Sequence, residues 1–157
     1  MKNRNIMLLF ALVLAGAVHG QEFKINKASG RLELNIGRVT VEGHNGNEII
    51  FTSENRRREK DERAEGLRLV NSLGLEDNTG LGINVADKGN VVEVYQLKQT
   101  HSPDIKILVP KGIIVSFKYE SQYGGEARFE NLTNEIEVSA QYNSVDLENV
   151  TGPLTVE

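Results

Sequence analysis

The chain has 157 residues, of which 39% are hydrophobic and 25% are charged, and its formal net charge is −4. The surplus of acidic residues argues against nucleic acid and anionic membrane surfaces as partners, because both attract proteins with a net positive charge. The sequence contains no cysteine, which excludes disulfides, thiol nucleophiles and thiolate metal sites. This length suits one domain with a modest core.

Residues 1–20 have the features of a cleaved export signal. Lys2 and Arg4 form a positive start, residues 6–18 are an apolar run, and small residues precede the expected cleavage position before Gln21. The apolar run is shorter than the ~20 residues that a transmembrane helix needs. We therefore expect an exported protein with no transmembrane segment after signal removal, located in the periplasm, on the outer surface or outside the cell.

Short runs in which apolar and polar residues alternate follow one another along residues 31–119. This period of two is typical of half-buried β-strands, and turn-forming Asn, Asp, Gly and Pro residues separate the runs. The sequence therefore predicts an all-β chain. The expected strands lie at 31–37, 38–43, 82–87, 91–95, 104–110 and 113–119.

A charged segment at 54–66 interrupts this alternation. It contains three consecutive arginines at 56–58, but the Glu and Asp residues around them neutralise their charge. We interpret it as a solvated excursion between two strands and not as a basic binding patch.

The last part of the chain repeats itself. The sequence FENLTNEIEV at 129–138 returns as LENVTGPLTV at 147–156, eighteen residues later. In a β-solenoid each rung stacks like residues over like, so such a repeat is expected there. We predict that residues 21–157 form a single β-repeat domain, a β-solenoid (β-helix-like) with two short strands per rung of ~18 residues, clearest at 127–157. An antiparallel β-sandwich is the alternative, because its hairpins also space strands regularly.

Three residues of this repeat region are expected to belong to the buried core: Val138, Leu147 and Val156. Asn131 and Asn149 recur at the repeat period, and we expect them to be corner residues that bond their own backbone.

Paired carboxylates are the main candidate for catalysis. Glu130 and Glu148 are eighteen residues apart, so in a solenoid they would stack on adjacent rungs at about 5 Å, near the separation that a retaining glycosidase uses. Both belong to the repeat itself, however, and the outward polar positions of the rungs explain them. We therefore predict no catalytic residues.

Metal and cofactor sites are not indicated either. His44 and His101 each stand alone in a turn-like setting, whereas a transition-metal site needs three or four clustered ligands. The segments 76–80 and 86–90 offer oxygen atoms but lack the alternating Asp/Asn pattern of a calcium loop. We expect no metal and no cofactor.

Tyr119, Tyr123 and Tyr142 lie close together in the sequence where the repeats begin. Exposed tyrosines stack on sugars and peptides, so these three are candidates for surface binding. A ladder of tyrosines that only packs along the solenoid is the alternative interpretation.

Four motifs occur in a fixed order: GRVTVEG at 37–43, DNTGLGINV at 77–85, ILVPKGIIV at 107–115 and ENVTGPLTV at 148–156. Together they resemble the bacterial putative-adhesin family of exported β-strand-repeat envelope proteins, a domain of unknown function. The resemblance implies an exported all-β repeat fold and supplies no catalytic residues. Members of that family usually continue through further rungs, so we expect the chain to be C-terminally truncated or completed by a partner.

These features predict a non-catalytic cell-envelope protein, an adhesin or surface-interaction module whose partners are envelope or surface proteins or glycans. A polysaccharide-active β-solenoid enzyme is one alternative, and a periplasmic scaffold or sensor is another. An export signal does not distinguish the cell surface from the periplasm.

Overall fold

The computed structural model describes residues 21–53 and 70–157, and in this part of the chain the regular elements are twelve β-strands. The expected export signal and the charged segment at 54–66 lie outside the described residues. No apolar helix of membrane-spanning length occurs within 21–53 and 70–157.

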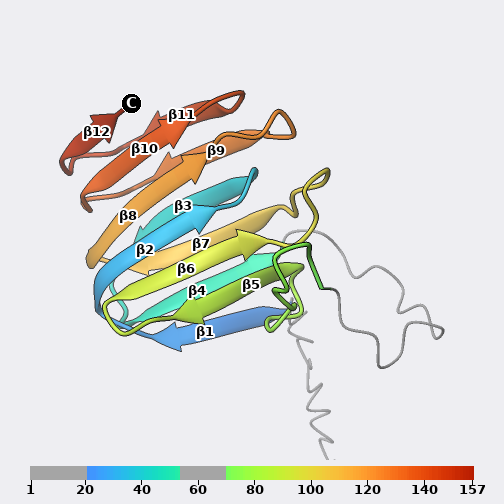
Figure 1. Ribbon diagram of the computed structural model, residues 1–157. Coiled ribbons are helices and arrows are strands. Elements are labelled where there is room, and N and C mark those ends of the chain that lie inside the picture. The colour runs from blue at the N-terminus through green and yellow to red at the C-terminus, as the bar shows by residue number, and fades with distance from the viewer. Residues whose placement is uncertain (1–20, 54–69) are drawn as a thin grey trace, which may run out of the picture.

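The strands form two six-stranded sheets that face each other (Figure 1). Sheet A contains, in spatial order, β1 (Glu22–Asn26), β4 (Glu48–Ser53), β7 (Ile105–Pro110), β3 (Val39–His44), β9 (Glu126–Glu130) and β11 (Ser144–Glu148). Sheet B contains, in spatial order, β12 (Leu154–Val156), β10 (Ile136–Ala140), β8 (Gly112–Tyr119), β2 (Ser29–Asn35), β6 (Val91–Gln96) and β5 (Ile83–Asp87).

Most neighbouring strands are parallel, which confirms the prediction of an all-β, solenoid-like fold. From β8 to β12 the chain alternates between the two sheets, so each pair of strands makes one rung. The eighteen-residue repeat is the step between rungs, because Ile136 pairs with Leu154 in sheet B and Glu126 pairs with Ser144 in sheet A. Antiparallel pairing, the rule in the alternative sandwich, links β1 to β4, β4 to β7 and β5 to β6 at one end of the molecule.

The rungs do not stack in the order of the sequence. The pair β2 and β3, which comes early in the chain, lies between β6 and β7 on one side and β8 and β9 on the other. Both neighbours of β2 and both neighbours of β3 are therefore parallel strands from much later in the sequence. This order places the first residues of β3, β7, β9 and β11 next to one another, at the same end of the strands of sheet A.

The alternating aliphatic and aromatic residues fill the space between the sheets. Leu32, Val92 and Val115 lie side by side in sheet B, and all three are fully buried. Between the sheets, the ring of Phe117 meets that of Phe129 edge-on, with centroids 6.0 Å apart. Such a column of apolar side chains, one layer per rung, is the main source of stability in a solenoid.

The prediction of three core residues in the repeat region is right for one of them. Val138 is buried, but Leu147 and Val156 are exposed. All three face inward in register with buried neighbours: Leu147 pairs with Phe129, and Val156 pairs with Val138. Leu147 and Val156 are exposed because β11 and β12 are the outermost strands of their sheets in the described structure.

Asn131 and Asn149 occupy corners, as predicted, with left-handed φ angles of 53° and 52°. Asparagine adopts this conformation more readily than most residues. The prediction that these side chains bond their own backbone is replaced by a contact between rungs, because Asn149 Nδ2 donates to Asn131 Oδ1 at 2.8 Å. The repeat therefore encodes a polar ladder in addition to the core.

Candidate binding groove

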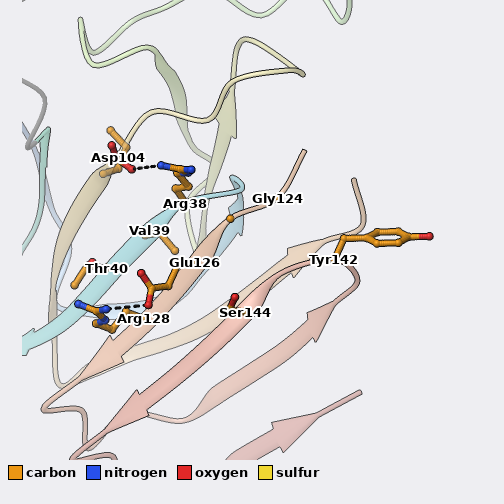
Figure 2. Close-up of a pocket in the computed structure, with 11 residues that line it drawn as sticks. Arg38, Val39, Thr40, Asp104, Gly124, Glu126, Arg128, Tyr142 and Ser144 are labelled. Carbon is orange, nitrogen blue, oxygen red and sulfur yellow. Dashed lines mark hydrogen bonds and ion pairs between the residues drawn. The ribbon is translucent and has the colours of Figure 1, made fainter. Parts of the chain in front are cut away.

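A groove of about 610 Å³ lies where β3, β7, β9 and β11 begin, on the outer face of sheet A (Figure 2). We call it the sheet A groove. Four segments that are far apart in the sequence supply its walls. Its lining residues are Arg38, Val39, Thr40, Asp104, Ile105, Gly124, Gly125, Glu126, Arg128, Tyr142 and Ser144.

Strand alternation decides which side chains reach the outer face. On β9, Ala127 and Phe129 are buried in the core, so Glu126 and Arg128 point to the opposite side. The beginning of β9 is fixed by backbone bonds on both sides, since Gly125 N donates to Gly37 O and Ser144 N donates to Gly125 O, each at 3.0 Å. The start of β9, which carries Glu126 and Arg128 into the groove, is therefore held by the backbone hydrogen bonds of sheet A.

Two ion pairs lie along the groove, and both are drawn in Figure 2. Arg38 Nη1 lies 3.4 Å from Asp104 Oδ1, which links β3 to β7. Arg128 Nη2 lies 2.9 Å from Glu126 Oε1 on the same strand, and this is the second pair drawn in Figure 2. The same nitrogen lies 3.9 Å from Asp146 Oδ2, so one guanidinium serves carboxylates on β9 and β11. These exposed pairs add little stability each, but they present donors and acceptors side by side.

The two carboxylates around Arg128 also interact with each other. A hydrogen bond with Asp146, together with Arg128, lowers the pKa of Glu126. The same hydrogen bond with Glu126 raises the pKa of Asp146. The hydrogen bond between the two carboxylates thus favours the ionised form of Glu126 and the protonated form of Asp146.

Tyr142 projects from the rim of the groove. It lies in the turn between β10 and β11 with a left-handed φ of 62°, and the residue as a whole is 74% exposed. Its neighbours hold the turn in place, since Gln141 N donates to Tyr119 O at 2.9 Å and Asn143 Nδ2 donates to Gly37 O at 2.9 Å. Figure 2 shows the ring of Tyr142 pointing away from the ion pairs.

The structure separates the three tyrosines that the sequence brought together. Tyr119 is buried, and its hydroxyl accepts a hydrogen bond from Gln96 Nε2 at 2.9 Å. Its ring lies against Gly37, where a β-carbon would come within 3.0 Å of it. Tyr119 is thus a core residue of the solenoid corner and is not available for surface binding. Tyr123 and Tyr142 are exposed, and surface binding by these two stays a prediction.

Glu130 and Glu148 are paired in register on β9 and β11, as the repeat predicted. Neither residue lines the groove. Glu130 Oε1 lies 3.7 Å from Arg128 Nε, so it forms part of the charged row on the outer face of sheet A.

The remaining candidates serve turns. His44 ends β3 and lies between two backbone groups, Glu48 O at 2.7 Å and Gly46 N at 3.1 Å. His101 is exposed in the loop before β7. In the segment 76–80, the Asp77 carboxylate accepts hydrogen bonds from the backbone N–H groups of Thr79 and Gly80. Within the described ranges, no group of three or more His, Asp or Glu residues is placed to hold a metal ion.

The sequence alone did not indicate Arg38, Asp104 or Arg128 as site residues. Each belongs to a different strand or strand entry, and their proximity depends on the unexpected position of β2 and β3 in the stack. Charged residues next to alternating strand residues are ordinary on a solvated face, so no local signal distinguishes these three.

Comparison with known proteins places the fold in a broad context. No family model and no curated protein matches the sequence, so membership of the putative-adhesin family stays a prediction. Among solved structures, a putative cell adhesion protein from Clostridium sporogenes ATCC 15579 is distantly similar. The similarity has 8% sequence identity and a TM-score of 0.36, and it covers 88% of this chain and 98% of that chain.

Proposed function

We propose that this chain is a non-catalytic, exported binding module of the cell envelope that contacts other envelope or surface proteins or glycans through the sheet A groove. The observation that carries the proposal is the rim position of Tyr142, exposed on a turn that is fixed to the ladder by its neighbours. An exposed aromatic ring at the rim of a groove that is lined by paired donors and acceptors can stack on a sugar or a side chain at little entropic cost.

The arrangement supports binding better than catalysis. Arg38 and Arg128 are each paired with carboxylates, and the carboxylates of the groove face the outer, solvated side of sheet A. A general acid or nucleophile is usually held in a water-excluding site that shifts its pKa for the reaction. In the sheet A groove the charged side chains pair with each other, and they are exposed to pair with polar groups of a ligand as well.

The test is a panel of glycans and matrix or envelope proteins, probed with the mature protein and with Tyr142→Ala. We expect the affinity for the panel members that bind to fall about tenfold in Tyr142→Ala. Leu73→Ala is the matched control, because Leu73 is as exposed as Tyr142 but lies outside the groove. Equal binding by all three proteins would contradict the proposal, and cleavage of a panel polysaccharide would replace it by an enzymatic function.

Location decides which partners are relevant. A tagged protein in cells of the source organism can be followed by fractionation and by protease treatment of intact cells. We expect loss of the tag on intact cells if the module works at the surface. Survival of the tag in the periplasm would direct the search to periplasmic envelope partners.

A further inference from the structure

The connection between β3 and β4 contains a pair of residues with a chemistry of its own. The two strands lie on either side of β7, and residues 45–47, which join them, are all exposed. Asn45 and Gly46 are the only Asn-Gly pair in the sequence. Such a pair is a common turn former. In it the backbone nitrogen of the glycine can also attack the asparagine side chain with little hindrance, because glycine has no β-carbon.

The imidazole of His44 lies against this pair. Gly46 N donates to His44 Nδ1 at 3.1 Å, and His44 Nε2 lies 2.7 Å from Glu48 O. A backbone N–H can only donate and a carbonyl can only accept, so these partners fix the tautomer: Nε2 carries the hydrogen and Nδ1 is the acceptor. A β-carbon on Gly46 would overlap the imidazole ring, so the two residues are in close contact. His44 therefore holds a basic nitrogen at the hydrogen that Gly46 N must lose in order to react.

We propose that Asn45 is a site of self-modification, at which His44 acts as the general base for the conversion of Asn45 to aspartate and isoaspartate. Gly46 N attacks Asn45 Cγ and forms a five-membered succinimide. The proton of Gly46 N passes to His44 Nδ1 and from there to the side-chain amide nitrogen, which leaves as ammonia. Water then opens the ring: attack at Cγ gives aspartate, and attack at the main-chain carbonyl carbon gives isoaspartate. The overall reaction consumes one water, releases one ammonia and restores neutral His44.

Other asparagines of the described structure lack this combination. Asn47 is exposed in the same connection, but it is followed by Glu48, whose side chain hinders attack by the backbone nitrogen. Asn134 is buried, and its amide nitrogen donates to two backbone carbonyls at 2.8 and 2.7 Å. Asn47 is therefore an internal control for Asn45, with the same exposure and only two residues away.

The modification changes the charge of a second, smaller cavity. Asn45 and Lys111 line this cavity of about 200 Å³ together with Asn131 from the corner after β9. The reaction replaces the neutral amide of Asn45 by a carboxylate, which shares the cavity with the ammonium group of Lys111. Isoaspartate also lengthens the backbone of the connection by one methylene. The site lies at the end of β3, whereas the sheet A groove lies where β3 begins, so the modification does not involve Tyr142 or the ion pairs of the groove.

The test incubates the mature protein for several weeks at neutral pH and measures the loss of each side-chain amide by digestion and mass spectrometry. We expect Asn45 to be converted while Asn47 stays an amide. His44→Gln should slow the conversion at least about tenfold, because glutamine can accept the Gly46 hydrogen bond but is no base, and a positioned general base typically contributes about a hundredfold or more. His101→Gln is the matched control, since His101 is an exposed histidine of another loop, and it should leave the rate unchanged.

Two comparisons separate the role of His44 as a base from a structural role. If His44 only fixed the connection, His44→Gln would loosen it and speed up the conversion, so a faster or unchanged rate in this variant would overturn the proposal. In a peptide of residues 39–52 the imidazole is not held by the fold, and His44→Gln should have little effect on the rate. An equal effect in peptide and protein would overturn the placement of the base by the fold. A wild-type protein that keeps its Asn45 amide while the peptide reacts would overturn the site itself.

Discussion

Val138 and Val156 lie in the same column of inward side chains, one rung apart, but their exposure to solvent differs greatly. Val138 is 2% exposed and Val156 is 64% exposed. We predict that Val138→Asp destabilises the fold by about 3 kcal/mol or more, because a carboxylate in the core lacks a partner or is forced to stay protonated. Val156→Asp should change stability by less than about 0.5 kcal/mol, since its carboxylate remains in water.

Urea denaturation of the two variants and the wild type measures this difference. The midpoint should fall for Val138→Asp at an unchanged slope, which identifies a change in stability and not in the denatured state. If both variants denature like the wild type, Val138 faces water and the inward frame of the repeat is wrong.

Among the elements, a polar ladder connects β7, β3, β9 and β11 of sheet A. Lys106 Nζ on β7 lies 2.7 Å from Glu42 Oε2 on β3, and Asn131 after β9 also hydrogen-bonds the Glu42 carboxylate. Asn149 after β11 donates in turn to Asn131. The hydrogen bond from Lys106, assisted by Asn131, lowers the pKa of Glu42 below its usual value of 4.5.

This lowered pKa predicts how stability depends on pH. The ionised Glu42 stabilises the folded state above the pKa of the unfolded chain, and the contribution is lost as the pH falls through the lower, folded pKa. Glu42→Gln should therefore cost up to about 1 kcal/mol at neutral pH and progressively less below pH 4.5. Thermal or urea unfolding of both proteins across this pH range measures the difference.

Glu120→Gln is the control, because Glu120 forms an ion pair with Lys118 that is exposed on both sides, with an N···O distance of 3.4 Å. Its effect should stay below about 0.5 kcal/mol. A cost of Glu42→Gln that does not change between neutral and acidic pH would show that packing, and not the charged hydrogen bond, is what the substitution removes.

The strands show what alternation predicts and what it does not. The runs from 31 to 43 and from 82 to 119 correspond to β2, β3 and β5 to β8, since a half-buried strand must alternate. Strands β1 and β4 were not predicted, although Phe23 and Ile25 in one and Ile49 and Phe51 in the other keep the period of two. Strand β1 is short and only partly buried at an edge, and β4 has three adjacent apolar residues that mask its alternation.

At the scale of the whole molecule, the eighteen-residue repeat predicted that equivalent residues of successive rungs lie over one another. It did not predict the order in which the rungs stack. Alternation fixes which face of a strand is buried, and many parallel neighbours satisfy that requirement equally well. The insertion of β2 and β3 between later rungs is therefore decided by the packing of the complete core. The sheet A groove depends on that order, which is why Tyr142 could be chosen from the sequence while Arg38 and Arg128 could not.

The edge strands of the two sheets predict a gradient of local stability across the solenoid. In a repeat structure each rung is stabilised by its neighbours, so strands with neighbours on both sides open less often than strands with one. The amides of Val115 on β8 and of Glu157 beyond β12 each donate a 2.9 Å hydrogen bond, to Glu135 O and Val138 O, respectively. Two hydrogen bonds of the same length thus lie at the centre of sheet B and at its β12 edge.

Native-state hydrogen exchange distinguishes them. We expect the Val115 amide to exchange through global unfolding and the Glu157 amide through local opening of β12, at a rate faster by several orders of magnitude. The two hydrogen bonds between the Asn78 side chain and the backbone of Val85 on β5 should slow hydrogen exchange in β5. The amides of β5 should therefore exchange more slowly than those of β12, although both strands are edges of sheet B. If Glu157 is protected as strongly as Val115, β12 unfolds together with the centre of sheet B, and the exposed residues Leu147, Leu154 and Val156 belong to the same cooperative unit as the core.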